Sequence, residues 1–331
     1  MRVIALRLVQ LVIVLWLVAT VMFFLVRAIP GGPVDAILQV RSDTPQGKVL
    51  REQVTHDLGL DKSLSTQYVN YLGDLATGNL GKQYGSNIPV STTLQQALPE
   101  SLQLMLYAQV LALAVAIPLG VITAYRAGSK VDRGVNATAF GLLSLPGFVL
   151  ALLLSFFVGV QLRWLPTSGY APGWLDPLFE SSRTPDIGKH IESMILPTVT
   201  LAVGQIAIYM RLLRSDMIAT LQENFITMAR SKGLSDRRIL WRHALRPSSL
   251  TLLTVAGLNV GALIGGAVVV EVIFGLPGIG KQIQIAFQQR QYVELQSLIV
   301  VVAVFFVAIN VAVDVLYRIV DPRIRRAATA A

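Results

Sequence analysis

Residues 214–247 read RSDMIATLQENFITMARSKGLSDRRILWRHALRP, a polar stretch with a long apolar run on either side of it. Its apolar residues recur at intervals of three and four on both sides of Gly233, which predicts two short helices. Gly233 can adopt the positive φ that ends a helix, and Ser235 is suited to cap the start of the second one. Seven basic residues against three acidic ones make the stretch cationic. We expect a helix-turn-helix between two membrane spans.

Two interpretations of this stretch are open. An excess of Arg and Lys is expected in any cytoplasmic loop of a membrane protein, so the stretch could be only a connector. Connectors between spans seldom carry two apolar helical faces, however, and an apolar face outside the bilayer needs a partner surface to cover it. We therefore favour an element that docks onto another protein.

The composition excludes an ordinary soluble protein. Of the 331 residues, 53% are hydrophobic and 14% are charged, whereas about 25% of the residues of a typical soluble domain are charged. The net charge of +9 does not predict a nucleic-acid partner, because the basic residues flank apolar runs and form no aromatic-studded basic face. There is no cysteine, and His56, His190 and His243 lack metal-ligand spacing, so we expect no metal site.

Six apolar runs are long enough to cross a bilayer, whose hydrocarbon core takes about 20 helical residues. The first run is longer than the apolar part of a signal peptide and lacks a small-residue exit, so we interpret it as a retained span. Pro146 lies inside the third run, where neighbouring groups in a membrane bundle can compensate for it. The runs cover residues 8–26, 101–124, 137–162, 192–210, 248–273 and 297–317.

The distribution of positive charge orients these spans. Of the 28 Lys and Arg residues, 17 lie in the two termini and in segments 125–136 and 211–247, which together are shorter than the other loops. Because basic loops stay in the cytoplasm, both termini and residues 214–247 are predicted to be cytoplasmic. The chain then divides into the amino terminus with the first span (1–29), an external insert (30–98) and a five-span core (99–331). In the insert we expect helices near residues 48–58 and 65–76, with Gly59 ending the first.

Residues 275–281, GLPGIGK, match the start of a phosphate-binding P-loop. Gln282 follows in place of the Ser or Thr that would hold Mg²⁺. A P-loop also joins a strand to a helix, whereas this segment leaves a membrane span on the predicted outer side, away from ATP. We expect a tight turn before a short helix, and no nucleotide site.

Small and polar residues within the spans are candidates for helix packing or for a transport pathway: Gly257, Gly261, Gly265, Glu271, Asn310 and Asp314. The three glycines recur every four residues, which suits close packing inside the bundle and equally a dimer or pathway face. Asp314 is expected near the membrane interface, paired with Arg318, and a proton relay is the minor alternative. The sequence contains neither a catalytic order of Ser, His and carboxylate residues nor paired intramembrane carboxylates, so it does not predict catalysis.

Thr227–Gly233 (TMARSKG) followed by Arg242–Arg246 (RHALR) resembles the cytoplasmic EAA loop of bacterial ABC-importer permeases, in particular the dipeptide/oligopeptide permease family. The chain departs from the general loop pattern at Thr227 and Met228, where Glu and Ala are usual, and its proline comes one place later, at Pro247. The resemblance covers nearly the whole chain through short ordered motifs at residues 29–31, 58–61, 78–81, 271–274, 277–280, 310–317 and 321–323.

This resemblance implies an all-α integral membrane protein of the bacterial inner membrane, with six spans in a type I ABC-importer permease fold and an external scoop insert. It implies a transport subunit rather than an enzyme, which lines a peptide pathway together with a homologous second permease subunit. An external substrate-binding protein would deliver the peptide, and separate ATP-binding subunits would hold ATP and Mg²⁺, with no cofactor on this chain. The residues that would couple to the ATPase are Phe225, Met228, Ala229, Lys232, Gly233, Leu234, Ile239, Leu240 and His243.

Other functions stay open at this point. Relatives of this branch carry nickel, glutathione or sugars as well as peptides, so the substrate is not fixed. A self-sufficient secondary transporter or channel predicts buried charge pairs, broken helices in matching repeats or a filter segment, and none is evident. A membrane-embedded enzyme would need a catalytic constellation. The expected contacts are thus with membrane lipid and with protein subunits, and not with nucleic acid.

Overall fold

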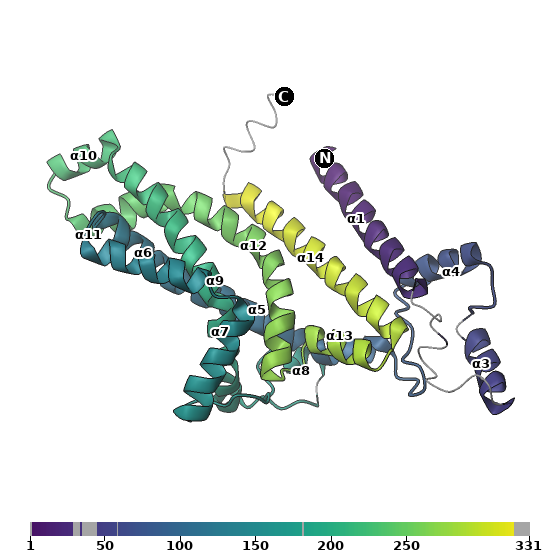
Figure 1. Cartoon of the computed structure of the whole chain (residues 1–331). Coiled ribbons are helices and arrows are strands. Elements are labelled where there is room, and N and C mark those ends of the chain that lie inside the picture. The colour runs from purple at the N-terminus through teal and green to yellow at the C-terminus, as the bar shows by residue number, and fades with distance from the viewer. Residues whose placement is uncertain (1, 29–33, 35–44, 58, 181, 321–331) are drawn as a thin grey trace. The chain divides into compact units, whose positions relative to one another are not determined.

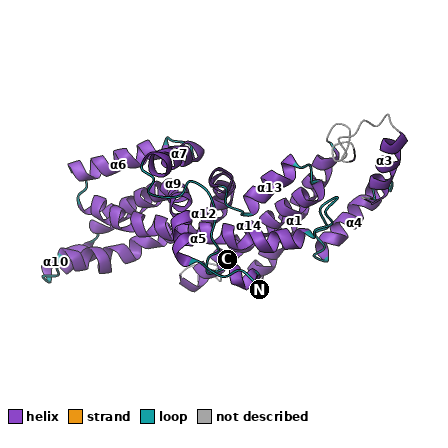
Figure 2. Ribbon diagram, turned by 90° about the horizontal axis from the view of Figure 1, so that it is seen from below, coloured by secondary structure: helices purple, strands orange, loops and turns teal. Residues whose placement is uncertain are grey.

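The computed structural model describes residues 2–28, 34, 45–57, 59–180 and 182–320. Within these ranges every named element is a helix, and the only β pairing is an isolated bridge between Lys82 and Pro89 (Figure 2). The all-α fold class is therefore confirmed for the described residues. The elements are α1 (Arg2–Arg27), α3 (Pro45–Asp57), α4 (Leu64–Ala76), α5 (Val90–Tyr125), α6 (Lys130–Leu143), α7 (Gly147–Leu154), the π-helix η1 (Ser155–Gln161), α8 (Asp176–Phe179), α9 (Ile187–Leu221), α10 (Asn224–Ser231), α11 (Asp236–Arg238), the π-helix η2 (Ile239–Ala244), α12 (Leu245–Phe274), α13 (Ile279–Gln288) and α14 (Tyr292–Val320).

Several of these helices are long and apolar enough to cross a membrane. Among the described residues, four qualify singly: Val90–Tyr125, Ile187–Leu221, Asp236–Phe274 and Tyr292–Val313. The pair Lys130–Leu143 and Gly147–Gln161 qualifies as a fifth if the two helices are counted as one bent span. In α1, the stretch Leu11–Arg27 is also an apolar helix. The prediction of a multi-pass helical membrane protein is confirmed, with four or five candidate spans where six were expected.

The third predicted span contains a sharp bend. Between Leu143 and Gly147 the chain turns by 101°, so the expectation that Pro146 would be accommodated inside one helix is wrong. Pro146 has no N–H to continue the helical ladder and disfavours helical backbone at the preceding residue. Its own ψ of 138° is extended, and it forms the cap that starts α7. The segment after α5 is also more helical than expected, because α6 begins at Lys130.

The contacts of the chain divide it into two compact units. Unit 1 comprises Met1–Leu98 and Pro277–Ala308, and unit 2 comprises Pro99–Leu276 and Ile309–Ala331. The three-part division predicted from the sequence stays a prediction.

Unit 1 contains both helices that were predicted for the insert. Gly59, just beyond α3, has a φ of +62°, and the Ser63 hydroxyl caps α4 by accepting the N–H of Thr66. The apolar face of α4, formed by Tyr68, Tyr71, Leu72 and Leu75, is half-buried, and α4 packs against α1. The Phe23 ring of α1 lies 5.2 Å from the Tyr68 ring and 5.6 Å from the Tyr71 ring of α4. Burial of these aromatic faces stabilises the contact between the two helices.

Unit 2 is built on the long pairing of α9 with α12 (Figure 1). Two glycines make room for a leucine side chain of α9: a Cβ on Gly266 would lie 2.8 Å from Leu201 Cδ1, and one on Gly120 would lie 3.0 Å from Leu213 Cδ2. The predicted glycine run behaves differently, since Gly261 is buried but Gly265 has open space beside it. In α12 a close side-chain contact is made at Gly266, one residue beyond Gly265 of the predicted pattern.

Candidate functional site

The stretch between α9 and α12 is shorter than the sequence predicted. Residues 214–221 continue α9 without a break, so the expected first helix of the stretch starts only at Asn224. The chain turns at Gln222 and Glu223, forms α10, and then enters α11 and η2, which run directly into α12. We call residues 222–244 the connecting segment. It lies at one end of unit 2, and α7 and α8 lie at the other (Figure 1).

Gly233 ends α10 as predicted, with a φ of +74°. Its N–H donates to Arg230 O at 2.9 Å, and the N–H of Leu234 donates to Ala229 O at 3.3 Å. These two bonds form a Schellman motif, which satisfies the last carbonyls of a helix and requires the left-handed conformation at the glycine. Leu234 completes the motif by packing on the core of unit 2. Ser235 caps the second helix through its backbone only, because its side chain makes no capping bond.

The predicted coupling residues face two ways. Ala229, Ile239 and Leu240 are buried, in a core that also contains Met217 of α9 and Leu252 of α12. By contrast, the side chains of Phe225 and Met228 are 46% and 60% exposed. Of the remaining predicted residues, Leu234 and His243 are half-buried, and Lys232 and Gly233 are exposed.

Two further residues of the connecting segment were not predicted from the sequence. Ile226 is fully buried beside Ala229, and Trp241 is 45% exposed. Together with Phe225 and Met228, Trp241 gives the segment an exposed apolar surface, which is a common property of protein interaction sites. Trp241 belongs to η2, and single π-helical turns are often found at functional sites.

Polar contacts join helices at the end of unit 2 where the connecting segment lies. Arg214 of α9 binds Asp132 of α6 with two parallel bonds, from Nε and Nη2, each of 2.7 Å. Asp132 is buried and also accepts the N–H of Gly128 at 2.8 Å. The hydroxyl of Tyr125, at the end of α5, donates to Asp236 Oδ2 at 2.8 Å. Bidentate Arg–carboxylate pairs fix orientation as well as distance, so α6 and α9 are held in one geometry here.

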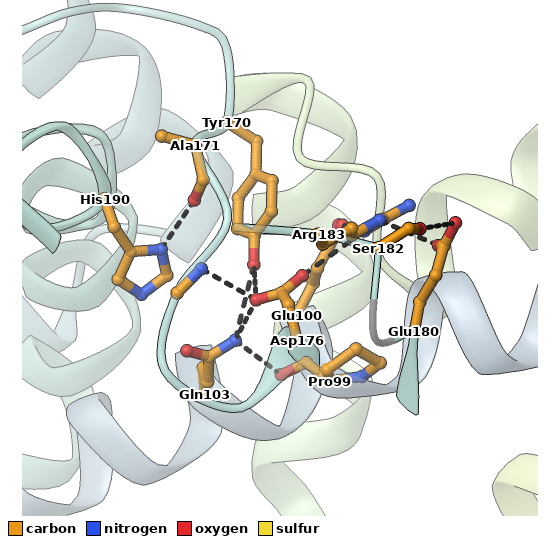
Figure 3. Close-up of polar contacts among 11 residues, drawn as sticks. Pro99, Glu100, Gln103, Tyr170, Ala171, Asp176, Glu180, Ser182, Arg183 and His190 are labelled. Carbon is orange, nitrogen blue, oxygen red and sulfur yellow. Dashed lines mark hydrogen bonds and ion pairs between the residues drawn. The ribbon is translucent and has the colours of Figure 1, made fainter. Parts of the chain in front are cut away.

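At the other end of unit 2, a cluster of polar residues surrounds Asp176 (Figure 3). Asp176 is fully buried, and its Oδ2 accepts bonds from Tyr170 Oη (2.7 Å), Gly173 N (2.7 Å) and Gln103 Nε2 (3.0 Å). Arg183 Nη1 lies 3.3 Å from Asp176 Oδ1 and 3.2 Å from Glu100 Oε1. Burial alone would raise the pKa of Asp176, but the hydrogen bonds from Tyr170, Gln103 and Gly173 outweigh it and hold that pKa below the usual value.

His190 belongs to the same region as a structural residue. Its Nδ1 lies 2.8 Å from Ala171 O, which can only accept, so Nδ1 carries the proton. In the neutral ring, Nε2 then accepts from Tyr107 Oη at 3.0 Å, and Tyr107 Oη accepts from Trp174 Nε1 at 2.9 Å. Through this chain and through Asp176, the loop from residue 163 to residue 186 is attached to α5 and α9. No sequence motif pointed to this cluster.

The remaining candidates have separate surroundings. Glu271 is buried in α12 and accepts a 2.6 Å bond from Ser101 Oγ of α5. Asn310 is half-buried on α14, and the side chain of Asp314 lies outside the described residues. Gly275 ends α12 with a φ of +65°, α13 begins at Ile279, and Lys281 Nζ donates to Gln284 Oε1 at 2.9 Å. The segment resembling a P-loop therefore joins two helices, and the predicted tight turn is confirmed.

Four or five candidate spans among the described residues, whose named elements are all helices, define the class: a multi-pass integral membrane protein. Residues 1–105 match the family model described as binding-protein-dependent transport system membrane component, N-terminal, and residues 116–326 match the model described as binding-protein-dependent transport system inner membrane component. The chain belongs to this family of inner-membrane transport components. The resemblance inferred from its motifs is thereby confirmed.

Individual relatives match almost the full chain. The chain is 37% identical to the di/tripeptide transport system permease protein DppB of Pseudomonas aeruginosa, with 92% of each chain covered. It is 37% identical to the oligopeptide transport system permease protein AppB of Bacillus subtilis, with 91% of this chain and 92% of the relative covered. It is 34% identical to the probable peptide ABC transporter permease protein y4tP of Sinorhizobium fredii, with 96% and 97% covered.

Proposed function

We propose that this chain is a membrane-spanning permease subunit of an ATP-driven peptide importer. The substrate class is supported by the names of relatives that are 34% to 37% identical over more than nine-tenths of the chain. In this proposal the chain lines the translocation path with a homologous second permease subunit, and an external binding protein delivers the peptide. ATP and Mg²⁺ are bound by separate ATPase subunits, and this chain carries no cofactor and no catalytic site.

The proposed fold has six spans: α1, α5, the bent pair from α6 to η1, α9, α12 and α14. Residues 30–98 form the external scoop insert, and both termini and the connecting segment face the cytoplasm of a bacterial cell. The charge of the connecting segment supports this orientation, because its Arg and Lys side chains are all exposed: Arg230, Lys232, Arg237, Arg238 and Arg242. Exposed basic residues between spans are typical of the cytoplasmic side.

One observation carries the coupling part of the proposal: α10 has two apolar faces with different environments. Ile226 and Ala229 pack into the core of unit 2, whereas Phe225 and Met228 are exposed on the adjacent side of the helix. A plain connector has no need for the exposed face. A docked ATPase subunit would cover Phe225 and Met228, and the buried face would pass its displacement to the bundle.

The path for this displacement is short. The buried residues of α10 share one core with Met217 of α9, Ile239 of η2 and Leu252 of α12. Because protein interiors are close-packed, an imposed movement of α10 shifts these neighbours and is not absorbed by empty space. The bidentate pair of Arg214 with Asp132 extends the rigid part to α6. In this proposal nucleotide-driven movement of the ATPase thus reaches three helices at once.

The test is a comparison of charged variants at the exposed face. Met228→Asp and Phe225→Asp should leave the permease in the membrane at normal amounts but release the ATPase on purification and abolish ATP-dependent uptake of a labelled dipeptide. Arg237→Asp is the matched control, because it makes a larger change of charge on an exposed position of the same segment and should retain the ATPase. Normal uptake by both Met228→Asp and Phe225→Asp would contradict the proposed docking.

A further inference from the structure

Unit 1 contains a cavity of about 340 Å³ that the proposed transport function does not use. Its walls come from five parts of the chain: the end of α1, the end of α3 with residues 59–62, helix α4, the loop around residues 79–81 and the start of α14. Hydrogen bonds fix these walls. Gln296 Nε2 of α14 donates to Met22 O of α1 at 2.9 Å, and Ser297 Oγ donates to Leu80 O at 2.7 Å.

Arg27, the last residue of α1, contributes a cation to this cavity, and its hydrogen-bond partners among the described residues are neutral. Its Nε and Nη2 donate to Gln67 Oε1 at 3.0 and 2.8 Å, and its Nη1 donates to Phe23 O at 3.1 Å. The guanidinium carbon also lies 3.4 Å from the centroid of the Phe23 ring. Among the residues that the structure describes, no carboxylate lies within ion-pair distance of Arg27. A half-buried charge with only neutral partners is unusual in a folded protein.

The orientation of this guanidinium is fixed in advance by the protein. Gln67, which accepts from it, is itself held by bonds from its Nε2 to Leu60 O (3.2 Å) and Lys62 O (2.8 Å). An arginine has five N–H donors, and the three bonds above use three of them. One N–H on each terminal nitrogen is left. Such a planar pair of donors matches the two oxygens of a carboxylate or phosphate group.

The surroundings favour a bound anion. Tyr71, on the same cavity wall, has a buried hydroxyl without a hydrogen-bond partner. Burial raises the pKa of Tyr71 to about 12, although Arg27 acts against the shift, so this hydroxyl is a proton donor at neutral pH. Lys62 adds positive charge at the rim. Asp74 is the opposing group, but it is exposed and already accepts a 3.0 Å bond from Asn79 Nδ2.

We infer that this cavity binds an oxyanion on the two remaining N–H groups of Arg27, and that the phosphodiester of a membrane phospholipid supplies it. The lipid source is indicated by α1 itself. Val21, Phe24 and Leu25, within two turns of Arg27, are exposed apolar side chains on a helix of a membrane protein. Acyl chains lying along them bring a phosphate group to the level of Arg27. The site does not depend on the chain being a peptide permease.

The test uses the full chain purified in mild detergent, with phosphatidylglycerol as the probe and dioleoylglycerol as the matched lipid that lacks phosphate. Retention of each lipid is measured by native mass spectrometry and by the shift in melting temperature. The wild-type chain should retain phosphatidylglycerol at least about tenfold better than dioleoylglycerol, in keeping with charge-assisted hydrogen bonds. Arg27→Gln should lose this preference, and Lys82→Gln, which removes an exposed cation elsewhere in unit 1, should keep it.

Arg27→Lys serves as the second variant if Arg27→Gln does not fold, because it keeps the charge and loses the paired donors. It should also weaken retention several-fold. Retention of phosphatidylglycerol by both Arg27 variants at the wild-type level would overturn the inference, as would equal retention of the two lipids by the wild-type chain. Equal protection by inorganic phosphate without lipid would support the oxyanion site but overturn the lipid source.

Discussion

Replacing Gly233 by valine is the sharpest perturbation of the connecting segment. With a φ of +74°, this residue has a conformation that a β-branched side chain adopts only under strain. A Cβ at this position would meet nothing within 4 Å, so the penalty comes from the backbone and not from a clash. Strain of this type amounts to about 1–3 kcal/mol. A strain of about 2 kcal/mol makes the left-handed turn about 30-fold less populated relative to other backbone conformations of residue 233.

The loss of this turn would have a defined consequence. Gly233 and Leu234 would no longer donate to the last carbonyls of α10, and Leu234 would leave its place on the core. The buried face of α10, at Ile226 and Ala229, would then lose its fixed position relative to α9 and α12. The bundle itself should still insert, because the strain is confined to a turn outside the long helices.

Gly233→Asn is the matched control, since asparagine tolerates the left-handed conformation far better than valine does. We expect both variants to reach the membrane in normal amounts. In proteoliposomes that contain the complete importer, ATP-driven uptake of a labelled dipeptide should fall at least about tenfold for valine and stay within about threefold of normal for asparagine. Equal, undiminished uptake by the two variants would refute the reasoning, because the geometry of the turn would then be irrelevant to transport.

Three further outcomes are expected. A cysteine at Thr77 should react with an impermeant thiol reagent outside intact cells, whereas one at Ser235 should react only after permeabilisation; the reverse pattern would invert the topology. Lys281→Ala should leave the ATPase activity of the complete importer within a few-fold of normal, and a loss of about a hundredfold would mean that this lysine cradles a phosphate. Since the pKa of Asp176 is lowered in the folded chain, its contribution to stability is present above the ordinary carboxyl pKa and is lost as the pH falls through the folded value. Asp176→Asn should therefore lower the free energy of unfolding by about 1–3 kcal/mol at pH 7 and remove this acid sensitivity. Glu180→Gln is the control, because Glu180 is a more exposed partner of Arg183, and it should change thermal unfolding much less.

The sequence was sufficient for features that depend on local chemistry. The turn at Gly233 and the end of the helix near Gly59 follow from the tolerance of glycine for positive φ, and both are present. The faces of α10 could not be assigned in this way. Phe225, Ile226, Met228 and Ala229 form one broad apolar side of that helix, so periodicity alone does not say which part of it meets the bundle. The burial of Ile226 and Ala229 in the folded chain shows which part of α10 meets the bundle.

The cluster around Asp176 was beyond sequence reasoning for a different reason. Gln103 and Asp176 are 73 positions apart, and Glu100 and Arg183 are 83 apart. One member of each pair lies on an apolar helix and the other in a polar loop, so no motif spacing connects them. The available signal was weak: acidic and amide residues at the outer end of a predicted span. Only the tertiary fold brings these residues together.

Helix α9 links the connecting segment to the cluster around Asp176. It has 35 residues, about 50 Å of helix, and both of its ends are fixed by specific contacts. His190 near one end is bonded to Tyr107 and to the loop that contains Asp176, and Arg214 near the other is bonded to Asp132. A displacement of the connecting segment therefore has to strain the contacts at His190 or bend α9 between its ends. Pro197 lies inside α9, between His190 and Arg214, and lacks the N–H that a straight helix uses. Bending of α9 is therefore easiest at Pro197.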